Sequence, residues 1–234
     1  MKSTVDEIRE RFDKDVERFS VLQTGQSATM DAPLGLELIC SAAAAITSGA
    51  KRLLDIGCGA GNYSLKMLEK LPNMDVTLVD LSRPMLDRAV QRVSAATRGK
   101  VAAIQSDVRE LDLGHNSFDV AVAGAVLHHL RTDAEWREVF GNVHGALGRS
   151  GSFWIWDMVE GESQKIQALQ WKRYGEYLEK LKNSAYRDEV FSYIQKEDTP
   201  RSLLFQVDLL REVGFSTVEI LHKNAVFAAF GAAK

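Results

Sequence analysis

Short apolar runs alternate with amphipathic segments through the middle of the chain. The apolar runs end near residues 56, 80, 105, 124 and 158, and the segments between them carry apolar residues at helical spacing. A repeated order of strand, helix and strand predicts β-α-β units, which form a parallel sheet and bind ligands at the carboxyl ends of the strands. The almost continuous apolar run at 118–124 is typical of a parallel strand that is covered on both faces.

The two flanks of this region have a different pattern. Residues 5–19 carry apolar side chains at helical spacing and predict one amphipathic helix, followed by the polar turn Thr24-Gly25-Gln26-Ser27 and an alanine-rich helix over 34–48. Residues 160–200 predict a long helical segment rich in aromatic side chains. Residues 216–231 have the pattern of a closing β-hairpin.

The composition is that of an ordinary globular protein. Of the 234 residues, 45% are apolar and 26% are charged, and the length suits one domain over residues 1–234. Because the sequence has no apolar span of about 20 residues and no signal-peptide pattern, we expect a cytoplasmic protein without membrane contact. A net charge of −3 without a basic stripe gives little support for a nucleic-acid partner. Nothing in the pattern predicts an oligomeric state.

The two cysteines and the histidines suggest neither disulfides nor a metal. Cys40 lies in the alanine-rich helix and Cys58 among glycines, so we expect both to be free thiols. No group of residues has the spacing of a metal-ligand cluster, and no metal is expected.

The residues that indicate chemistry follow the first predicted strand, which ends at Asp55 and leads into Gly57, Gly59 and Gly61. Glycine tolerates a positive φ and has no β-carbon. This spacing therefore predicts a tight strand-to-helix turn whose backbone N–H groups can approach a nucleotide-like ligand. The dinucleotide pattern G-x-G-x-x-G would need a glycine where Asn62 stands, so the turn departs from an NAD site.

A second carboxylate strengthens the nucleotide hypothesis. Asp80 ends the next apolar run, about 20 residues on, where an acidic side chain can accept hydrogen bonds from ribose hydroxyls. Together, Asp55, the glycine turn and Asp80 resemble the class I, Rossmann-like family of S-adenosylmethionine (SAM)-dependent methyltransferases. The resemblance implies SAM as the cofactor. It also implies a doubly wound, seven-stranded α/β sheet that is mostly parallel, with an antiparallel C-terminal strand and helices on both faces.

The same resemblance assigns residues to the parts of the cofactor. In this family an acidic residue after the third strand and the next backbone N–H bind adenine, and Asp107 and Val108 match that pattern. Met85 either touches the adenine ring or is an ordinary buried methionine. The full set of implied cofactor residues is Asp55, Gly57, Gly59, Asp80, Leu81, Met85, Asp107, Val108 and Ala123.

The candidate catalytic residues are His128 and His129, which follow the fourth strand at the position that lines the reactive end of the pocket in the resembled family. Imidazole titrates near neutral pH, so either ring could orient or deprotonate a methyl acceptor. A purely structural role for both rings is the alternative.

The family commonly covers its substrate with helices, which gives the flanking segments a function. Residues 1–50 would form an N-terminal lid, and 160–200 a substrate cover. Trp171 and Tyr174 in that cover, with Trp156 at the end of the fifth strand, are the candidate substrate-binding residues. Packing of these helices and aromatics onto the core is the alternative.

The sequence therefore predicts a SAM-dependent methyltransferase that acts on the oxygen, nitrogen or carbon of a small molecule. The Asn/Asp-Pro-Pro-aromatic signature of amino-adenine and glutamine-amide methyltransferases is absent, as is an obvious catalytic-cysteine motif. Four alternatives stay open: a carboxy-SAM synthase or similar SAM-modifying enzyme, a tRNA-modifying methyltransferase, a non-catalytic SAM-binding module, and an NAD-binding oxidoreductase.

Overall fold

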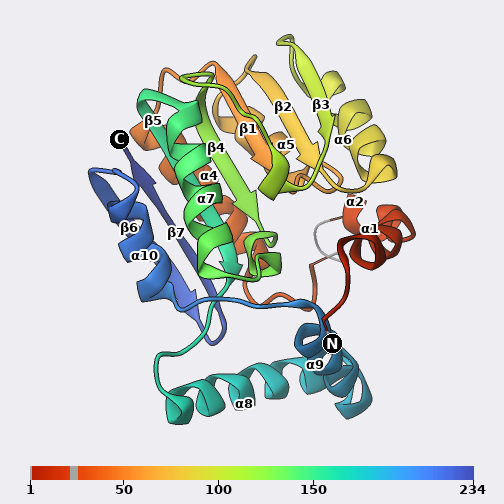
Figure 1. Ribbon diagram of the computed structural model, residues 1–234. Coiled ribbons are helices and arrows are strands. Elements are labelled where there is room, and N and C mark those ends of the chain that lie inside the picture. Colours follow the sequence, from red (N-terminus) through yellow and green to blue (C-terminus); the bar gives the residue numbers. More distant parts are fainter. Residues whose placement is uncertain (1, 22–25) are drawn as a thin grey trace.

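Alternate residues of the central strands point to opposite faces of one sheet, and both faces are apolar. In the strand Phe118–Gly124, Val120 and Val122 pack into one core cluster, whereas Ala121 and Ala123 pack into the other. This is the burial expected of a strand with helices on both sides. The computed structural model describes residues 2–21 and 26–234 (Figure 1).

The sheet has seven strands in the order β3-β2-β1-β4-β5-β7-β6. β7 is antiparallel to both of its neighbours, and the remaining neighbouring pairs are parallel. The predicted doubly wound sheet is confirmed, and the chain reverses its winding direction between β1 and β4. The strands are β1 Arg52–Ile56, β2 Asp75–Asp80, β3 Val101–Gln105, β4 Phe118–Gly124, β5 Leu147–Met158, β6 Thr217–Asn224 and β7 Phe227–Ala233.

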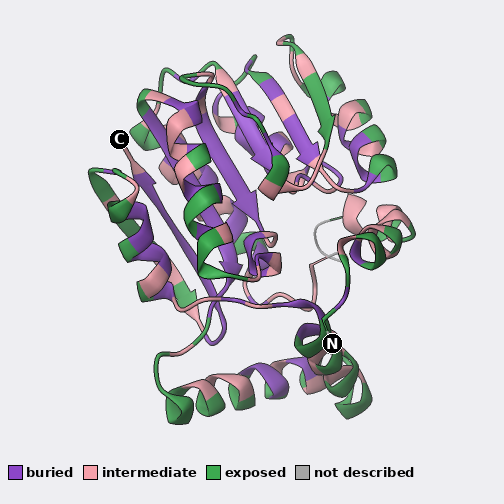
Figure 2. Cartoon of the chain, in the orientation of Figure 1, coloured by how far each residue is buried: buried purple, intermediate pink, exposed green. Residues whose placement is uncertain are grey.

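Helices cover both faces of this sheet (Figures 1 and 2). One face is covered by α4 (Ala32–Ile46), α5 (Asn62–Lys70) and α6 (Arg83–Ala96), and the other by α7 (Asp133–Ala146) and α10 (Leu203–Glu212). Two short 3₁₀ helices, η1 (Val108–Glu110) and η2 (Leu127–His129), follow β3 and β4. Thus the chain after each of these strands lies at the same edge of the sheet as the glycine turn.

The predicted N-terminal helix is two helices, α1 (Val5–Asp13) and α2 (Val16–Ser20). The helical backbone is interrupted at Asp15, whose N–H donates to the carbonyl of Phe12, three residues back. The apolar spacing continues across the break, which is why periodicity alone does not reveal it. Of the predicted polar turn, Thr24 and Gly25 lie outside the described residues.

Residues 160–200 form α8 (Gln164–Leu181) and α9 (Ser184–Glu197), separated at Asn183, which caps the start of α9 through its side-chain oxygen. Both helices lie beyond the end of the sheet, beside the N-terminus, and much of their surface is exposed (Figures 1 and 2). Among the helices of residues 2–21 and 26–234, none is both long and apolar enough to cross a membrane.

Candidate functional site

A cavity of about 300 Å³ lies at the carboxyl ends of β1, β2 and β4, beside the point where the winding of the sheet reverses. This is where open α/β sheets bind their ligands. Of the predicted cofactor residues, the cavity wall contains Gly57, Gly59, Asp80, Leu81, Met85, Asp107 and Val108. Seven residues predicted from separate stretches of the chain therefore meet at one cavity.

Two glycines of the glycine turn, Gly57 and Gly59, have different surroundings. Gly57 has φ +65°, and a β-carbon there would lie 2.5 Å from the side chain of Val126. Gly59 has φ +49°, and no atom of the described residues lies within 4 Å of the place where its β-carbon would be. Gly57 is thus needed for close packing, whereas Gly59 leaves open space on the ligand side of the turn.

Asp80 holds this turn in place. One carboxylate oxygen accepts a hydrogen bond from the N–H of Gly59 at 2.8 Å, and the other accepts one from the N–H of Ser82 at 2.9 Å. Burial raises the pKa of Asp80 to about 6, although these backbone donors act in the opposite direction. The carboxylate is therefore positioned by the backbone and borders the cavity.

Asp55, one of the predicted cofactor residues, lies beneath the cavity and is not part of its wall. Its side chain is fully buried and accepts hydrogen bonds from the hydroxyl and the N–H of Ser64, at 2.6 and 3.1 Å. Burial raises the pKa of Asp55 to about 7. Asp55 thus joins the end of β1 to the first turn of α5.

Ala123 also lies outside the cavity wall, because it points into the core on the α7 face. Its neighbour Gly124 lines the cavity instead. A β-carbon at Gly124 would lie 2.2 Å from the ring of Tyr63, so only glycine fits there without displacing that ring.

The proposed adenine end contains an ion pair that the sequence did not reveal. Asp107 accepts hydrogen bonds from the N–H of Arg109 at 3.0 Å and from its Nε at 2.9 Å. Burial favours the neutral acid, but the hydrogen bonds from Arg109 outweigh it and lower the pKa of Asp107. The carboxylate stays ionised, and the N–H of Val108 follows it at the start of η1.

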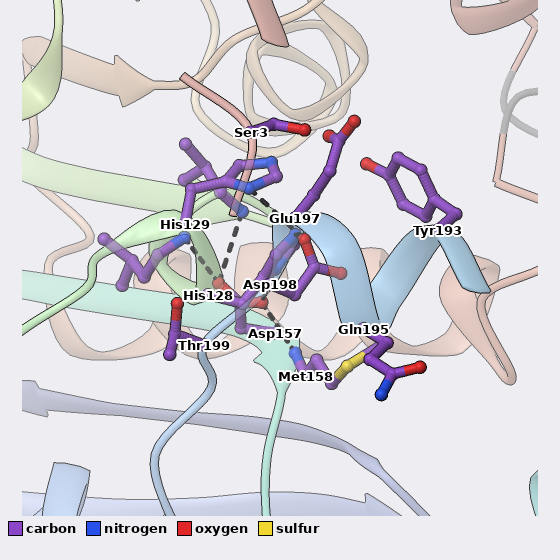
Figure 3. Close-up of polar contacts among 12 residues, drawn as sticks. Ser3, His128, His129, Asp157, Met158, Tyr193, Gln195, Glu197, Asp198 and Thr199 are labelled. Atoms are coloured by element: carbon purple, nitrogen blue, oxygen red, sulfur yellow. Dashed lines mark hydrogen bonds and ion pairs between the residues drawn. The ribbon is translucent and has the colours of Figure 1, made fainter. Parts of the chain in front are cut away.

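The two histidines have different environments (Figure 3). His129 borders the cavity, whereas His128 is buried behind it with Nδ1 against the carboxylate of Asp157. Burial opposes the charge on His128, but Asp157 and Asp198 raise its pKa to about 9. Burial and the positive charges of nearby groups lower the pKa of His129 well below its usual value. Of the two candidate rings, His129 is thus the one at the cavity, whereas His128 lies behind it.

The three predicted substrate residues pack elsewhere. Trp156 is fully buried between α4 and β7, where its ring stacks on Phe227. Trp171 and Tyr174 pack against Phe191 of α9, and none of the three lines the cavity. These aromatics therefore belong to the packing alternative.

The cavity is covered by the N-terminal segment. Its wall includes side chains of α1 and α2, among them Ile8, Phe12 and Phe19, but no described residue of 160–200. Instead, α8 and α9 support the segment: Tyr174 donates to the carbonyl of Ala28 at 2.9 Å. The predicted substrate cover thus acts through its contacts with the N-terminal part of the chain.

Some residues of the cavity wall were not predicted because their neighbours in space are distant in sequence. Ser3 and Arg131 are an example, since Arg131 donates to the carbonyl of Ser3 across 128 residues. Asn62 could have been predicted from the sequence, because it stands where the dinucleotide pattern would need a glycine. It lines the cavity and its amide donates to the carbonyl of Phe19 at 2.9 Å.

Comparison with known proteins agrees with this geometry. The family model described as a methyltransferase domain matches residues 54–153, which contain the glycine turn, Asp80, Asp107 and both histidines. Residues 54–153 of this chain therefore carry a methyltransferase domain.

Curated relatives differ in how much of the chain they match. This chain is 24% identical over 189 residues to a carboxy-S-adenosyl-L-methionine synthase of Nautilia profundicola, covering 78% of this chain and 77% of the relative. It is 35% identical over 101 residues to the YqeM protein of Bacillus subtilis, covering 43% of this chain and 39% of that protein.

The alignment with one solved structure covers the whole chain. That structure is the 1,6-didemethyltoxoflavin-N1-methyltransferase of Burkholderia thailandensis, determined with 1,6-didemethyltoxoflavin and S-adenosylhomocysteine (SAH). The TM-score is 0.63 at 20% identity, and the alignment covers 100% of this chain and 92% of that one. At this identity the similarity supports the fold.

Proposed function

We propose that this protein binds SAM in the described cavity and transfers its methyl group to a small-molecule acceptor. The observation that carries the proposal is the meeting of the glycine turn, Asp80 and the Asp107–Val108 segment along one cavity that reaches His129 at another part of its wall. The first three supply donors and acceptors for a nucleoside, and His129 supplies a polar group near a reactive end.

Each part of the cofactor has a candidate partner. Backbone N–H groups near Gly57 and Gly59 would bind the methionine end, the Asp80 carboxylate would accept from the ribose hydroxyls, and Asp107 with the N–H of Val108 would bind adenine. Leu81 and Met85 are the apolar residues beside the nucleoside, and Met85 is buried in the cavity wall.

Methyl transfer requires alignment more than covalent chemistry by the protein. The acceptor atom forms a bond to the methyl carbon, the sulfur–carbon bond breaks, its electron pair stays on sulfur, and SAH is released. Holding the acceptor in line with that bond and excluding water supplies much of the rate. The apolar residues of α1 and α2 over the cavity would exclude water, and His129 would orient the acceptor through a hydrogen bond.

A binding measurement tests the cofactor assignment. Calorimetry of the full chain should show one SAH site with micromolar or tighter affinity, and no heat above dilution with NADH. Binding of NADH without binding of SAH would overturn the proposal and favour an oxidoreductase.

A labelled-methyl screen tests the reaction itself. The protein is incubated with methyl-labelled SAM and a small-molecule extract, and label should appear in one or a few small molecules while SAH accumulates in equal amount. In a parallel incubation with total tRNA, label in tRNA but in no small molecule would contradict the small-molecule assignment. SAH binding without any transfer would favour the non-catalytic module.

The relative from Nautilia profundicola makes a SAM-modifying enzyme the second candidate, because the alignment covers most of both chains. A carboxylated cofactor would need a cationic partner for its added carboxylate. The two arginines of the cavity wall are already engaged, Arg109 by Asp107 and Arg131 by backbone carbonyls, which favours methyl transfer. Mass spectrometry of the cofactor that co-purifies distinguishes the two: a methyltransferase should carry SAM or SAH, a synthase a carboxylated SAM.

A further inference from the structure

A group of ionisable side chains lies where the end of α9 meets η2 (Figure 3), and one of its members, His129, lines the cavity. The members of the group are His128, His129, Asp157 and Asp198. The exposed fraction is 0% for Asp157, 4% for Asp198 and 8% for His128. Such groups are costly to bury unless each is paired.

The pairing in this group is incomplete. Among residues 2–21 and 26–234, the buried ring nitrogens of His129 and the buried Oδ1 atom of Asp198 have no partner in full hydrogen-bond geometry. The backbone of Glu197 is near enough to favour a proton on the His129 ring, but burial outweighs it. The nearest approach between the His129 ring nitrogens and the Asp198 oxygen is 3.3 Å, from His129 Nδ1 to Asp198 Oδ1. Buried polar atoms in native proteins are nearly always satisfied, so these three atoms indicate a missing partner.

The spacing of the donor atoms suits a metal ion. His128 Nε2 lies 3.7 Å from Asp198 Oδ1, and one potential ligand atom from each of His128, His129 and Asp198 lies within 4.8 Å of the others. Ligand atoms about 2.1 Å from a tetrahedral zinc ion are about 3.4 Å apart. The two measured separations lie on either side of that value.

The remaining nitrogen of His128 has the partner that a metal-binding histidine usually has. His128 Nδ1 contacts the carboxylate of Asp157, which is itself fixed by the N–H groups of Leu127 at 2.7 Å and Met158 at 2.6 Å. A carboxylate in this position orients the ring and leaves Nε2 as the ligand atom. Here Nε2 is the atom that faces Asp198.

The charges lead to the same conclusion. Asp157 and Asp198 are two buried carboxylates, and a proton on His128 would neutralise one of them. Glu197, a third acidic group nearby, is already paired with Arg11 at 2.7 Å. A divalent cation would neutralise both aspartates and would give a partner to Nδ1 of His129 and Oδ1 of Asp198.

We propose that His128, His129 and Asp198 bind one divalent transition-metal ion of the zinc or iron(II) type, with Asp157 positioning His128. Two imidazoles and one carboxylate favour these metals over magnesium or calcium, which prefer oxygen ligands alone. Because His129 also borders the cavity, the ion lies beside the space proposed for the methyl acceptor and favours an acceptor with an oxygen or nitrogen donor. Only this last step rests on the proposed function.

Cobalt(II) provides a test that does not need the acceptor. Untagged full-length protein is dialysed against a chelator and titrated with Co²⁺, whose visible spectrum reports nitrogen and oxygen ligands in a low-coordinate site. We expect one equivalent to bind with micromolar or tighter affinity and one equivalent of Zn²⁺ to displace it. No spectral change up to millimolar Co²⁺ would overturn the proposal and leave a shared proton as the link between the aspartates.

Matched variants locate the ion. Asp198→Asn and His129→Gln should each weaken Co²⁺ binding at least about 50-fold, and Asp157→Asn about 10- to 100-fold through His128. The control is His222→Gln, because His222 forms another histidine–aspartate pair, with Asp31 at 2.9 Å, away from the cluster. Equal binding in wild type, Asp198→Asn and His129→Gln would place the ion elsewhere and contradict the proposal.

The variants must also be shown to fold. Circular dichroism and SAH calorimetry are run on each, and His129→Gln decides if Asp198→Asn does not fold, since the His129 ring faces the cavity. Loss of Co²⁺ binding with normal SAH binding supports the metal site. If the wild-type protein did not bind SAH at all, the proposed function would be wrong. The Co²⁺ result would still stand.

Discussion

At the scale of single residues, one carboxylate organises the cofactor end of the cavity. Asp80 accepts from the N–H groups of Gly59 and Ser82, and burial raises its pKa to about 6. As the pH falls through that value the free protein gains a proton on Asp80. A protonated acid accepts hydrogen bonds from two ribose hydroxyls less well, so cofactor binding must then release the proton.

We therefore expect the affinity for SAH to fall about tenfold between about pH 7 and about pH 5, because the lower value is about one unit below the pKa of Asp80. Calorimetry at constant ionic strength measures this change. Asp80→Asn should bind SAH more weakly at both pH values and without the pH dependence. An unchanged pH dependence in that variant would show that another group is responsible.

For single residues, the sequence predicted correctly which residues lie at the cavity when they follow a strand. It did not predict to which face of the sheet a side chain within a strand points. Gly57, Asp80 and Asp107 were found because the loop after a parallel strand always lies at the ligand edge of the sheet. Trp156 and Asp157 are adjacent at the end of β5, and their side chains point to opposite faces. Trp156 enters the core against α4, while Asp157 reaches His128. Which of the two side chains faces the core depends on the register of β5 in the sheet, and this register cannot be read from the sequence.

At the scale of elements, close packing distinguishes two glycines in helices. Gly35 lies in α4 directly beneath the indole of Trp156, and a β-carbon there would lie 2.3 Å from the ring. Trp156 is fully buried and cannot move away. Gly141 lies in α7, and within residues 2–21 and 26–234 no atom comes within 4 Å of the equivalent position.

These two glycines form a matched pair for mutation. Gly35→Ala should destabilise the protein by about 1–3 kcal/mol, because overlap with the Trp156 ring outweighs the better helix propensity of alanine. Gly141→Ala has no overlap and should stabilise it by about 0.5–1 kcal/mol. Urea unfolding followed by circular dichroism measures both. Equal effects of the two substitutions would mean that helix propensity, not packing, sets the result.

The order and type of the strands and helices were predictable because hydrophobic periodicity is local. The boundaries that failed are breaks within continuous apolar patterns, between α1 and α2 and between α8 and α9. At Asn183 a capping side chain begins a new helix. Such a break depends on hydrogen bonds of a few backbone groups, which the periodicity does not register.

At the scale of the whole molecule, the cover of the cavity depends on contacts between segments distant in sequence. Arg11 of α1 donates to the carboxylate of Glu197 at 2.7 Å and to the hydroxyl of Tyr193 at 2.6 Å. At the C-terminal end of α1, Asp13 accepts a hydrogen bond from the hydroxyl of Ser82 at the start of α6, at 2.6 Å. Contacts across more than 180 residues have no signature in a single sequence, which is why the lid was predicted without its support.

Breaking the Arg11 contact should therefore loosen the cover without touching the cofactor residues. Arg11→Met keeps the apolar stem of the side chain but leaves Glu197 buried without its partner, which costs about 3 kcal/mol. We expect faster hydrogen exchange in residues 4–13 and several-fold faster release of SAH, both because α1 detaches more often from α9. Hydrogen-exchange mass spectrometry and stopped-flow fluorescence measure the two effects.

The matched control is Arg9→Met, since Arg9 pairs with Asp6 in an exposed position on the same helix. Exposed pairs contribute little, so exchange and release should stay near the wild-type values. If both variants released SAH equally fast, α1 would owe its place over the cavity to the apolar side chains beneath it, and the support from α9 would be incidental.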